Sequence, residues 1–450
     1  MLKKRSLGYS NRMDCKEMFA GKRITVMGLG LLGRGVGDAG FLAQCGATVL
    51  VTDTKSETEL AESVAKLKRY PNITFKLGGH DINDFKNCDM VLKAAGVPLD
   101  SKEIAAARAA GVQVVMSTAL FAKYAMDTGA TIVGVTGTRG KSTVSQMIFH
   151  GLKQAGKEVF LGGNVRGIST LAMLPSIEKG DIVVLELDSW QLQGFGDLKI
   201  SPQISIFTNL MPDHQNYYPD MDAYFADKAN IFRFQKEGDA LFAGKDVSEK
   251  INAAQIKVPA PIPSDWKLKV VGEHNRENAA FTAAALRALG LSDEEIKTGL
   301  ESFEPVEGRL QFVRELNGVK IYNDNNATTP EATIAALTAL GKNVTLITGG
   351  SEKGLPLDEL VSLIKQNVSH VILLTHENYK GSARLALLLK ESSIQFEEAA
   401  SLESAVEAAL SHTEKGTLLF SPAFASFGMF KNEYERNDEF LRLTRQASAS

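Results

Sequence analysis

The stretch that decides the fold is TIVGVTGTRGKST, from Thr131 to Thr143. Its first residues form an apolar run typical of a buried strand, and the glycine turn that follows opens a predicted helix. Backbone N–H groups of such a turn converge on one point, where the helix dipole also favours an anion. Lys141 adds a positive charge there, and Ser142 or Thr143 can offer a hydroxyl to Mg²⁺. The stretch therefore predicts a nucleoside triphosphate site, formed by Gly137, Thr138, Arg139, Gly140, Lys141, Ser142 and Thr143.

A second glycine turn lies near the N-terminus, after an apolar stretch at 23–27. Gly28, Gly30 and Gly33 precede a predicted helix, and a second strand ends at Asp53, 20 positions after Gly33. This spacing is that of a dinucleotide fingerprint, in which a pyrophosphate lies on the helix N-terminus. NAD and a UDP-sugar both carry a pyrophosphate and a ribose, so the turn admits either ligand. We favour a UDP-type ligand, because an NAD enzyme has no evident need for the second phosphate loop.

Predicted strands and helices alternate along the chain in three consecutive units. Strands are expected near 23–27, 48–52, 73–76, 90–93 and 112–116, then 131–135, 181–187 and 203–208, and finally 319–323, 343–348, 370–374 and 416–421. Such alternation predicts an α/β protein with a Rossmann-like N-terminal domain, a central P-loop ATPase-type domain with a mostly parallel sheet, and a Rossmann-like C-terminal domain. The expected ranges are an arm at 1–20 and domains at 21–125, 126–305 and 306–450.

Composition describes an ordinary globular protein of 450 residues, with 44% hydrophobic and 23% charged residues and a formal net charge of −3. So balanced a charge gives no indication of a nucleic-acid surface. Cys15, Cys45 and Cys88 form no CxxC pair and fit a reducing compartment. No apolar run approaches the roughly 18 residues of a membrane-spanning helix, and no apolar segment follows the basic residues 3–5. We expect a cytoplasmic monomer without a membrane or nucleic-acid partner.

From about residue 22 to its C-terminus the chain resembles the Mur ligase family. The resemblance rests on an ordered series of motifs: the phosphate loop, GGN at 162–164, LELDS at 185–189, TNLMPDH at 208–214, DK at 227–228, GEHNREN at 272–278, EGR at 307–309, YND at 322–324 and GGSEKG at 349–354. It implies an ATP-dependent ligase that joins a carboxylate to an amine through an acyl phosphate. The GLGLLG turn with Thr52–Thr54, the run LFSPAFASFGMF at 419–430 and the lack of an Asp-Asn-Pro-Arg motif indicate the member that adds D-glutamate to UDP-N-acetylmuramoyl-L-alanine.

The resemblance also implies roles for particular residues. The catalytic set is Lys141, Glu186, His214 and Lys228, and two Mg²⁺ ions are held by Ser142, Glu186, His214 and Lys228. The implied form of Lys228 is a carbamate made with CO₂, which reverses its charge so that it can face a metal. Further ATP contacts are Asn275, Asn278, Arg309 and Asp324. The UDP-substrate contacts are Gly30, Leu31, Leu32, Asp53, Thr54, Lys55, Gly96 and Asn164, and the D-glutamate contacts are Thr328, Lys353, Ser426 and Phe427.

The sequence departs from the family pattern at Asn326, where many members have lysine, so the role of that lysine is not carried over. Two other ligases of the superfamily remain as alternatives, the L-alanine-adding Mur ligase and folylpolyglutamate synthetase. An alternative of another class is an NAD-dependent oxidoreductase that uses Gly28–Asp53. A third is a nucleotide-binding protein without catalysis, against which the intact Lys141, Glu186, His214 and Lys228 argue.

Overall fold

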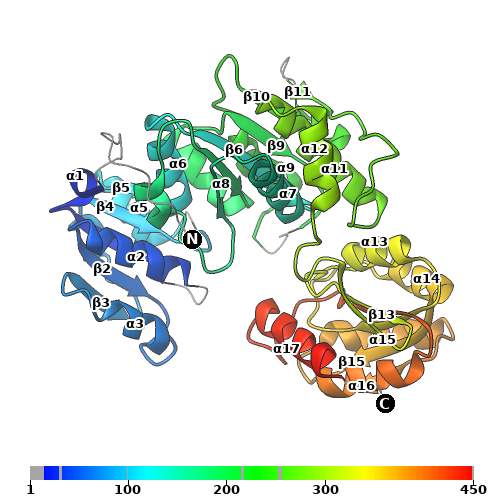
Figure 1. Cartoon of the computed structure of the whole chain (residues 1–450). Helices are drawn as coiled ribbons and strands as arrows, with labels where there is room; N and C mark the ends of the chain where they lie inside the picture. The colour runs from blue at the N-terminus through cyan, green and yellow to red at the C-terminus, as the bar shows by residue number, and fades with distance from the viewer. Residues whose placement is uncertain (1–14, 30–32, 99, 214–216, 252–255, 448–450) are drawn as a thin grey trace. The chain divides into compact units, whose positions relative to one another are not determined.

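The computed structural model describes residues 15–29, 33–98, 100–213, 217–251 and 256–447. Three sheets follow one another along the chain, each with helices packed around it (Figure 1). This arrangement confirms the predicted fold class. No helix in these ranges is long and apolar enough to span a membrane.

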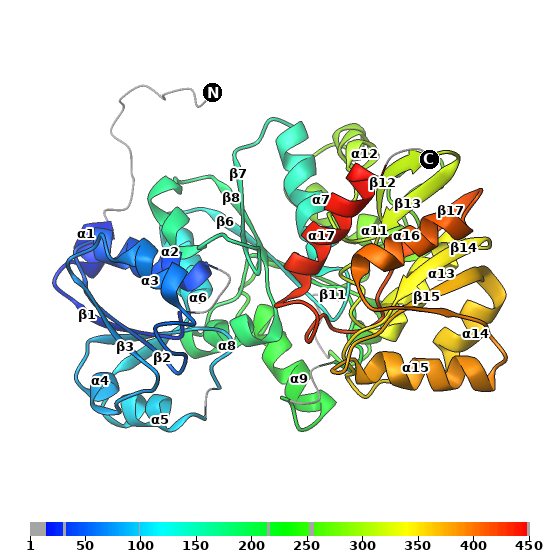
Figure 2. The same ribbon diagram turned by 90° about the horizontal axis from the view of Figure 1, so that it is seen from below.

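The first sheet is parallel, with strand order β3-β2-β1-β4-β5. Its strands are almost continuous apolar runs, as expected where helices cover both faces of a parallel sheet (Figure 2). The strands are β1 (Arg23–Met27), β2 (Thr48–Asp53), β3 (Ile73–Leu77), β4 (Met90–Lys93) and β5 (Gln113–Val115). The helices are α1 (Cys15–Phe19), α2 (Arg34–Gln44), α3 (Ala61–Leu67), α4 (Asn83–Lys86), α5 (Lys102–Ala109) and α6 (Ser117–Asp127).

The second sheet is also parallel, with strand order β11-β10-β9-β6-β8-β7. Its strands are β6 (Thr131–Thr136), β7 (Val159–Gly163), β8 (Ile182–Glu186), β9 (Ile204–Phe207), β10 (Ala240–Ala243) and β11 (Ile256–Lys257). The helices are α7 (Lys141–Gln154), α8 (Ser189–Leu198), α9 (Met221–Lys228), α10 (Lys245–Ser248), α11 (Glu273–Ala288) and α12 (Asp293–Ser302), with short 3-10 turns η1 (Leu171–Ser176) and η2 (Ala229–Ile231).

The third sheet has the order β12-β13-β17-β14-β15-β16 and is parallel except for its edge pair, β12 and β13. Its strands are β12 (Gln311–Leu316), β13 (Val319–Asn323), β14 (Val344–Thr348), β15 (Val368–Leu374), β16 (Glu397–Ala399) and β17 (Gly416–Phe420). The helices are α13 (Pro330–Leu340), α14 (Asp358–Asn367), α15 (Lys380–Glu391), α16 (Leu402–His412) and α17 (Glu433–Gln446).

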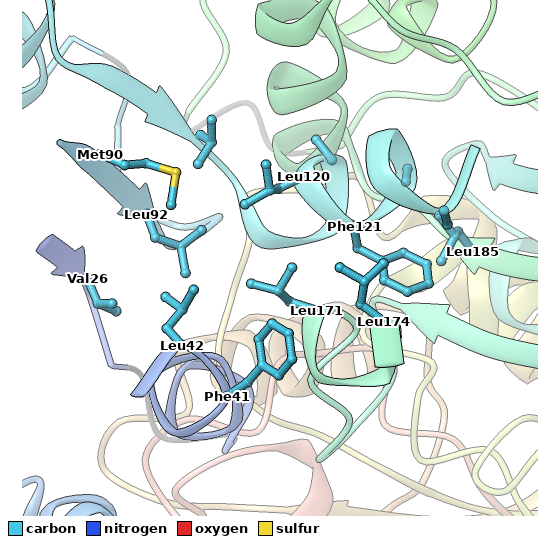
Figure 3. Packing of buried hydrophobic residues seen from close by; sticks show 14 of the residues in the cluster. Val26, Phe41, Leu42, Met90, Leu92, Leu120, Phe121, Leu171, Leu174 and Leu185 are labelled. Carbon is cyan, nitrogen blue, oxygen red and sulfur yellow. The ribbon is translucent and has the colours of Figure 1, made fainter. Parts of the chain in front are cut away.

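The first two sheets share one hydrophobic core. Leu42 and Leu92 from the first domain, Phe121 from α6, and Leu174 and Leu185 from the second domain belong to the same buried cluster (Figure 3). The chain accordingly divides into two compact units. The first comprises residues 1–261 and 278–299, and the second comprises 262–277 and 300–450, with buried clusters of its own around β14 and β17.

Candidate active site

The phosphate loop lies between β6 and α7, at the carboxyl end of the strand flanked by β9 and β8. Gly137 and Gly140 have φ angles of 143° and 82°, a region that L side chains rarely adopt. A Cβ at Gly137 would collide with Thr208 Oγ1, and one at Gly140 with the side chain of Asn278. Both glycines are therefore required by backbone shape and by close neighbours, as the sequence predicted for an anion-binding turn.

Residues after β9 brace this loop from the side. The backbone N–H groups of Thr138 and Arg139 donate to the main-chain and side-chain oxygens of Asn209, at 3.0 and 2.8 Å. The hydroxyl of Thr138 accepts from the amide of Met211 at 2.9 Å, and Arg139 pairs with Asp213 at 3.5 Å. The motif at 208–214 thus holds the loop in shape, although its last residue, His214, lies outside the described residues.

Two lysines meet at one carbonyl oxygen of the loop. Lys141 Nζ lies 2.9 Å from Gly137 O, and Lys228 Nζ lies 3.0 Å from the same atom. Lys228 ends α9, is 1% exposed, and lies 4.7 Å from the ring of Tyr224. Burial and the positive charge of Lys141 hold the pKa of Lys228 well below its ordinary value. The structure therefore brings together two predicted catalytic residues from distant parts of the sequence.

Oxygen ligands suitable for Mg²⁺ stand on neighbouring elements. Glu186 ends β8, is 5% exposed, and is in register with Val135, just before the loop. Ser142 and Thr143 open α7 and are also buried. A carboxylate and hydroxyls beside a phosphate loop are the hard donors that Mg²⁺ prefers. No group of three or more histidine, cysteine, aspartate or glutamate side chains that could hold a metal occurs in the described ranges. The donor set around the loop still fits a magnesium ion shared with phosphate oxygens.

Among the predicted UDP-substrate residues that the structure describes, Asp53, Thr54 and Lys55 lie at the carboxyl end of β2, and Gly96 follows that of β4. The strand β1 lies between β2 and β4 in the first sheet. Asp53 is 5% exposed and accepts from the backbone amides of Leu29 and Lys55, at 2.8 and 3.0 Å. Thr54 and Gly96 are exposed. Ligands of open α/β sheets bind at this edge, so these positions agree with a substrate site. Gly30, Leu31 and Leu32 lie outside the described residues.

Lys93 is a functional candidate that sequence reasoning missed. It ends β4, is 2% exposed, and donates to the carbonyls of Ala94, Ala95 and Val97. Burial lowers its pKa to about 8. The three hydrogen bonds of Lys93 hold the turn that contains Gly96. The sequence feature that could have indicated Lys93 is that it is the last residue of an otherwise apolar strand.

Asn164 follows β7 and touches both neighbouring domains of the first unit. Its backbone N–H donates to Glu186 O at 2.7 Å, and its Oδ1 accepts from Arg34 of α2 at 2.9 Å. Asn164 was predicted as a substrate contact, whereas Arg34 was not singled out. On α11, Asn278 lies against Gly140, and Asn275 donates to Val271 O at 2.8 Å.

In the second compact unit, the D-glutamate candidates lie on segments that follow β13, β14 and β17, again adjacent strands. Lys353 Nζ lies 3.4 Å from Thr328 Oγ1. The segments of Lys353 and Ser426 are joined by a bridge between Ser351 and Ala425, with backbone hydrogen bonds of 2.9 and 3.1 Å. Lys353, Thr328 and Ser426 thus bring a cation and two hydroxyls to the segments that follow the carboxyl ends of three adjacent strands.

Ser426 and Phe427 differ in their surroundings. Ser426 is 1% exposed, and its hydroxyl has no hydrogen-bond partner among the described residues. Phe427 is 61% exposed, which leaves its ring available for contact. A buried hydroxyl without a partner is costly unless a ligand completes it, so Ser426 fits a binding role.

Asp324, predicted as an ATP ribose contact, is buried at the end of β13. Leu310 N and Ser421 Oγ donate to its two oxygens at 3.0 and 2.8 Å. Burial raises its pKa to about 7, opposed by those hydrogen bonds and by the positive charge of Arg309. Arg309 itself, also predicted for ATP, is half-buried on the turn before β12.

Arg436 of α17 is a second residue that sequence reasoning missed. It is fully buried and donates to Asn325 Oδ1 at 2.8 Å, to Asn325 O at 2.9 Å and to Phe424 O at 3.2 Å. It thus fastens the segment that leads to Thr328 to the segment that leads to Ser426. The sequence feature that could have indicated Arg436 is an arginine at a position that shares the buried face of the C-terminal helix with Phe440.

Comparison with known proteins gives the class of protein that this fold and site define. Sequence models of three Mur ligase domains match the chain in order: the MurD-like N-terminal domain over residues 22–116, the middle domain over 135–260 and the glutamate ligase domain over 308–424. The chain belongs to the Mur ligase family.

Within this family the chain is similar to UDP-N-acetylmuramoylalanine–D-glutamate ligases. That of Roseiflexus sp. (strain RS-1) is 35% identical, over 94% of this chain and 98% of that protein. That of Borreliella burgdorferi (strain ZS7) is 34% identical, over 93% and 96%, and that of Clostridium kluyveri is 32% identical, over 96% and 98%.

Solved structures show the same fold at lower identity. The UDP-N-acetylmuramate–alanine ligase of Thermotoga maritima has a TM-score of 0.62 and 20% identity, covering 95% of this chain and 100% of that chain. A pseudomurein peptide ligase type C from Methanothermus fervidus has a TM-score of 0.54 and 18% identity, with the same coverage.

Proposed function

We propose that this chain joins D-glutamate to UDP-N-acetylmuramoyl-L-alanine with ATP, forming an amide bond and releasing ADP and phosphate, in peptidoglycan precursor synthesis. The observation that carries the proposal is the similarity over nearly the whole chain to ligases named for that reaction. The phosphate loop supports it, because Lys141 and Lys228 meet at the carbonyl of Gly137 and Glu186 ends the adjacent strand β8.

The reaction runs in two balanced steps. An oxygen of the L-alanyl carboxylate bonds to the γ-phosphorus of ATP, and ADP leaves. The amine of D-glutamate then attacks the acyl carbon, phosphate leaves, and the nitrogen loses a proton. Since the first step brings two anions together, the positive charge of Lys141 in the phosphate loop would offset their repulsion, and positioning would supply most of the catalysis. Two bound Mg²⁺ ions, held by Ser142, Glu186, His214 and Lys228, would supply further charge neutralisation.

Lys228 has the properties that carbamylation requires. CO₂ is attacked by a neutral amine, and the lowered pKa of Lys228 favours that form. The neutral nitrogen bonds to the carbon of CO₂, one C=O π bond gives its electrons to oxygen, and the nitrogen releases one proton, so that a neutral amine becomes a carbamate anion. We therefore propose that Lys228 serves as an oxygen ligand of Mg²⁺, as an ammonium beside Lys141 could not.

The remaining predicted residues divide among the three substrates. ATP would contact the phosphate loop, Asn275, Asn278, Arg309 and Asp324. UDP-N-acetylmuramoyl-L-alanine would contact Gly30, Leu31, Leu32, Asp53, Thr54, Lys55, Gly96 and Asn164. D-glutamate would contact Thr328, Lys353, Ser426 and Phe427, since its carboxylates need a cation and hydroxyl donors. We further propose a cytoplasmic monomer with functional domains at 21–125, 126–305 and 306–450.

The deciding experiment measures phosphate release with ATP, each candidate acceptor and each candidate amino acid. Release that requires both UDP-N-acetylmuramoyl-L-alanine and D-glutamate supports the proposal. Release with UDP-N-acetylmuramate and L-alanine, or with a folate and glutamate, would assign one of the sister ligases instead. A change in nicotinamide absorbance without ATP turnover would support the oxidoreductase reading.

A further inference from the structure

An arginine and an aspartate on α2 grip the segment that begins with Asn164. Arg34 opens α2 and Asp38 lies one turn later, so both side chains leave the same face of the helix. Arg34 donates to Asn164 Oδ1 at 2.9 Å, and Ser169 Oγ donates to Asp38 Oδ1 at 2.6 Å. The two contacts hold residues 164–169 at both ends. We call this pair of residues the α2 clamp.

The clamp is closely packed. Asp38 is 6% exposed and also receives a hydrogen bond from the side chain of Ser117 at the start of α6. Gly37 lies between the two clamp residues, where a Cβ would collide with Ser169. A cation in the first turn is opposed by the helix dipole, and the negative charge of Asp38, one turn later on the same face, offsets it in part. Arg34 is thus held between Asp38 on its own helix and Asn164 Oδ1.

The contact with Arg34 fixes which way the amide of Asn164 points. A guanidinium carries only donors, so Asn164 must offer it Oδ1 and turn its Nδ2 elsewhere. The backbone of Asn164 is held as well, by its hydrogen bond to Glu186 O at the end of β8. Side chain and main chain together set Asn164 as a hydrogen-bond donor beside the phosphate-loop strands.

We propose that the α2 clamp positions the UDP-linked substrate by holding Asn164 as a donor to an acceptor oxygen in its muramoyl-alanine part. The inference rests on the proposed function, because it takes Asn164 as a contact to that substrate. Arg34 acts through Asn164 and is a positioning residue. Asp38 holds the far end of the same segment, so that Asn164 cannot swing away from α2.

Steady-state kinetics of the full-length enzyme test the proposal. Arg34→Met should raise KM for the UDP-linked substrate about tenfold, the usual scale for losing a charge-assisted hydrogen bond, and leave KM for ATP and D-glutamate unchanged. Arg34→Lys should recover part of the loss, because an ammonium also donates to Oδ1. Asn164→Asp still accepts from Arg34 but lacks the donor, so it should lose as much as Asn164→Ala. The control is Arg23→Met, which breaks a surface pair with Asp89 at the opposite end of β1.

The double variant Arg34→Met/Asn164→Ala gives the sharpest readout. If Arg34 acts through Asn164, the KM of the double variant for the UDP-linked substrate should be no higher than that of Asn164→Ala alone. Fully additive losses, or an equal rise in every KM with a lowered melting temperature, would overturn the clamp. Titration calorimetry with the UDP-linked substrate alone applies the same test without turnover. Non-additive Kd values there would support the clamp even if D-glutamate proved to be the wrong amino acid, and additive values would overturn it.

Discussion

Lys141 and Lys228 differ in how much of their surroundings the sequence alone could predict. The role of Lys141 could be predicted because the loop that presents it is local, a strand, a glycine turn and a helix in one stretch. The shared carbonyl of Gly137 and the burial of Lys228 could not, because they depend on α9 packing against that loop. For Lys228 the family resemblance implies a role as a metal ligand, and the structure adds that this lysine is buried beside Lys141.

We expect Lys141→Ala to lower kcat at least about 100-fold, because the charge that offsets two approaching anions is lost. The side chain is only half-buried, so its removal should not change the melting temperature appreciably. Lys153→Ala on the exposed face of the same helix is the control and should keep full activity. A Lys141→Ala enzyme with most of its turnover would contradict the nucleotide assignment.

Carbamylation of Lys228 predicts a spectroscopic signal. In ¹³C-labelled bicarbonate, the protein should show a carbamate carbon resonance that Lys228→Met lacks and Lys153→Ala retains. Lys228→Met should also lose activity, since the proposed ligand of Mg²⁺ is removed. A wild-type spectrum without that resonance, in an active sample, would show that the amine works unmodified.

Ser426 offers a test of the D-glutamate site that is separable from stability. Its buried hydroxyl has no described partner, so Ser426→Ala should leave the free energy of unfolding unchanged or slightly higher. The same change should raise KM for D-glutamate about tenfold and leave KM for ATP unaltered. Ser421→Ala is the contrast, because that hydroxyl bonds Asp324 and its loss should destabilise the protein. If Ser426→Ala binds D-glutamate normally, the hydroxyl lies outside the site.

At the scale of elements, most strands were predictable, including the three-residue edge strand β5, whereas β7, β10, β11, β12 and β16 were missed. The predicted strand at 319–323 is β13, but its antiparallel partner β12 was missed. The signal was present in Asn317-Gly318, which has φ angles of 53° and 83° and joins β12 to β13, as expected for a hairpin turn. The strands β7, β10, β11 and β16 are short or lie at or near a sheet edge, so their sequences show little of the regular apolar pattern that identifies a strand.

The turn after β4 carries a prediction for Lys93. Lys93→Met keeps the length of the side chain but removes the donor to three carbonyls of the turn that contains Gly96. We expect a KM for the UDP-linked substrate raised several-fold, on the order of one lost hydrogen bond, with KM for ATP unchanged. Lys102→Met, an exposed lysine at the start of α5, is the control. Equal effects on both KM values would mean that Lys93 supports the fold alone.

At the scale of the whole molecule, three sheets use one plan. In each, several candidate residues follow the carboxyl ends of three adjacent strands along the chain: β2, β1 and β4, then β9, β6 and β8, then β13, β17 and β14. This regularity follows from parallel βα units and could be predicted. The fusion of the first two sheets into one compact unit could not, because it depends on α6 and η1 sharing a core with both.

The two compact units each contain a buried acid that makes stability depend on pH. Burial raises the pKa of Asp38 to about 6 and that of Asp324 to about 7, from an ordinary value of 3.8 in the unfolded chain. Between pH 4 and those values the folded state keeps protons that the unfolded chain has lost. Each acid therefore lowers the free energy of unfolding as pH rises, by amounts on the order of 3 and 4 kcal/mol once deprotonated.

The two tryptophans allow the acids to be tested separately. Trp190 belongs to the first unit and Trp266 to the second, so fluorescence of Trp266→Phe follows the first unit and that of Trp190→Phe the second. Denaturant unfolding is measured from pH 4 to 8. The free energy of unfolding of Asp38→Asn, minus that of the protein with Asp38, should rise with pH up to about pH 6, and only in the first unit. Asp324→Asn should gain up to about pH 7, in the second unit only. Taking differences cancels the exposed carboxylates whose pKa is lowered, such as Asp81, which act in the opposite direction. A difference that stays flat with pH would mean that the acid is already ionised in the folded protein at pH 4.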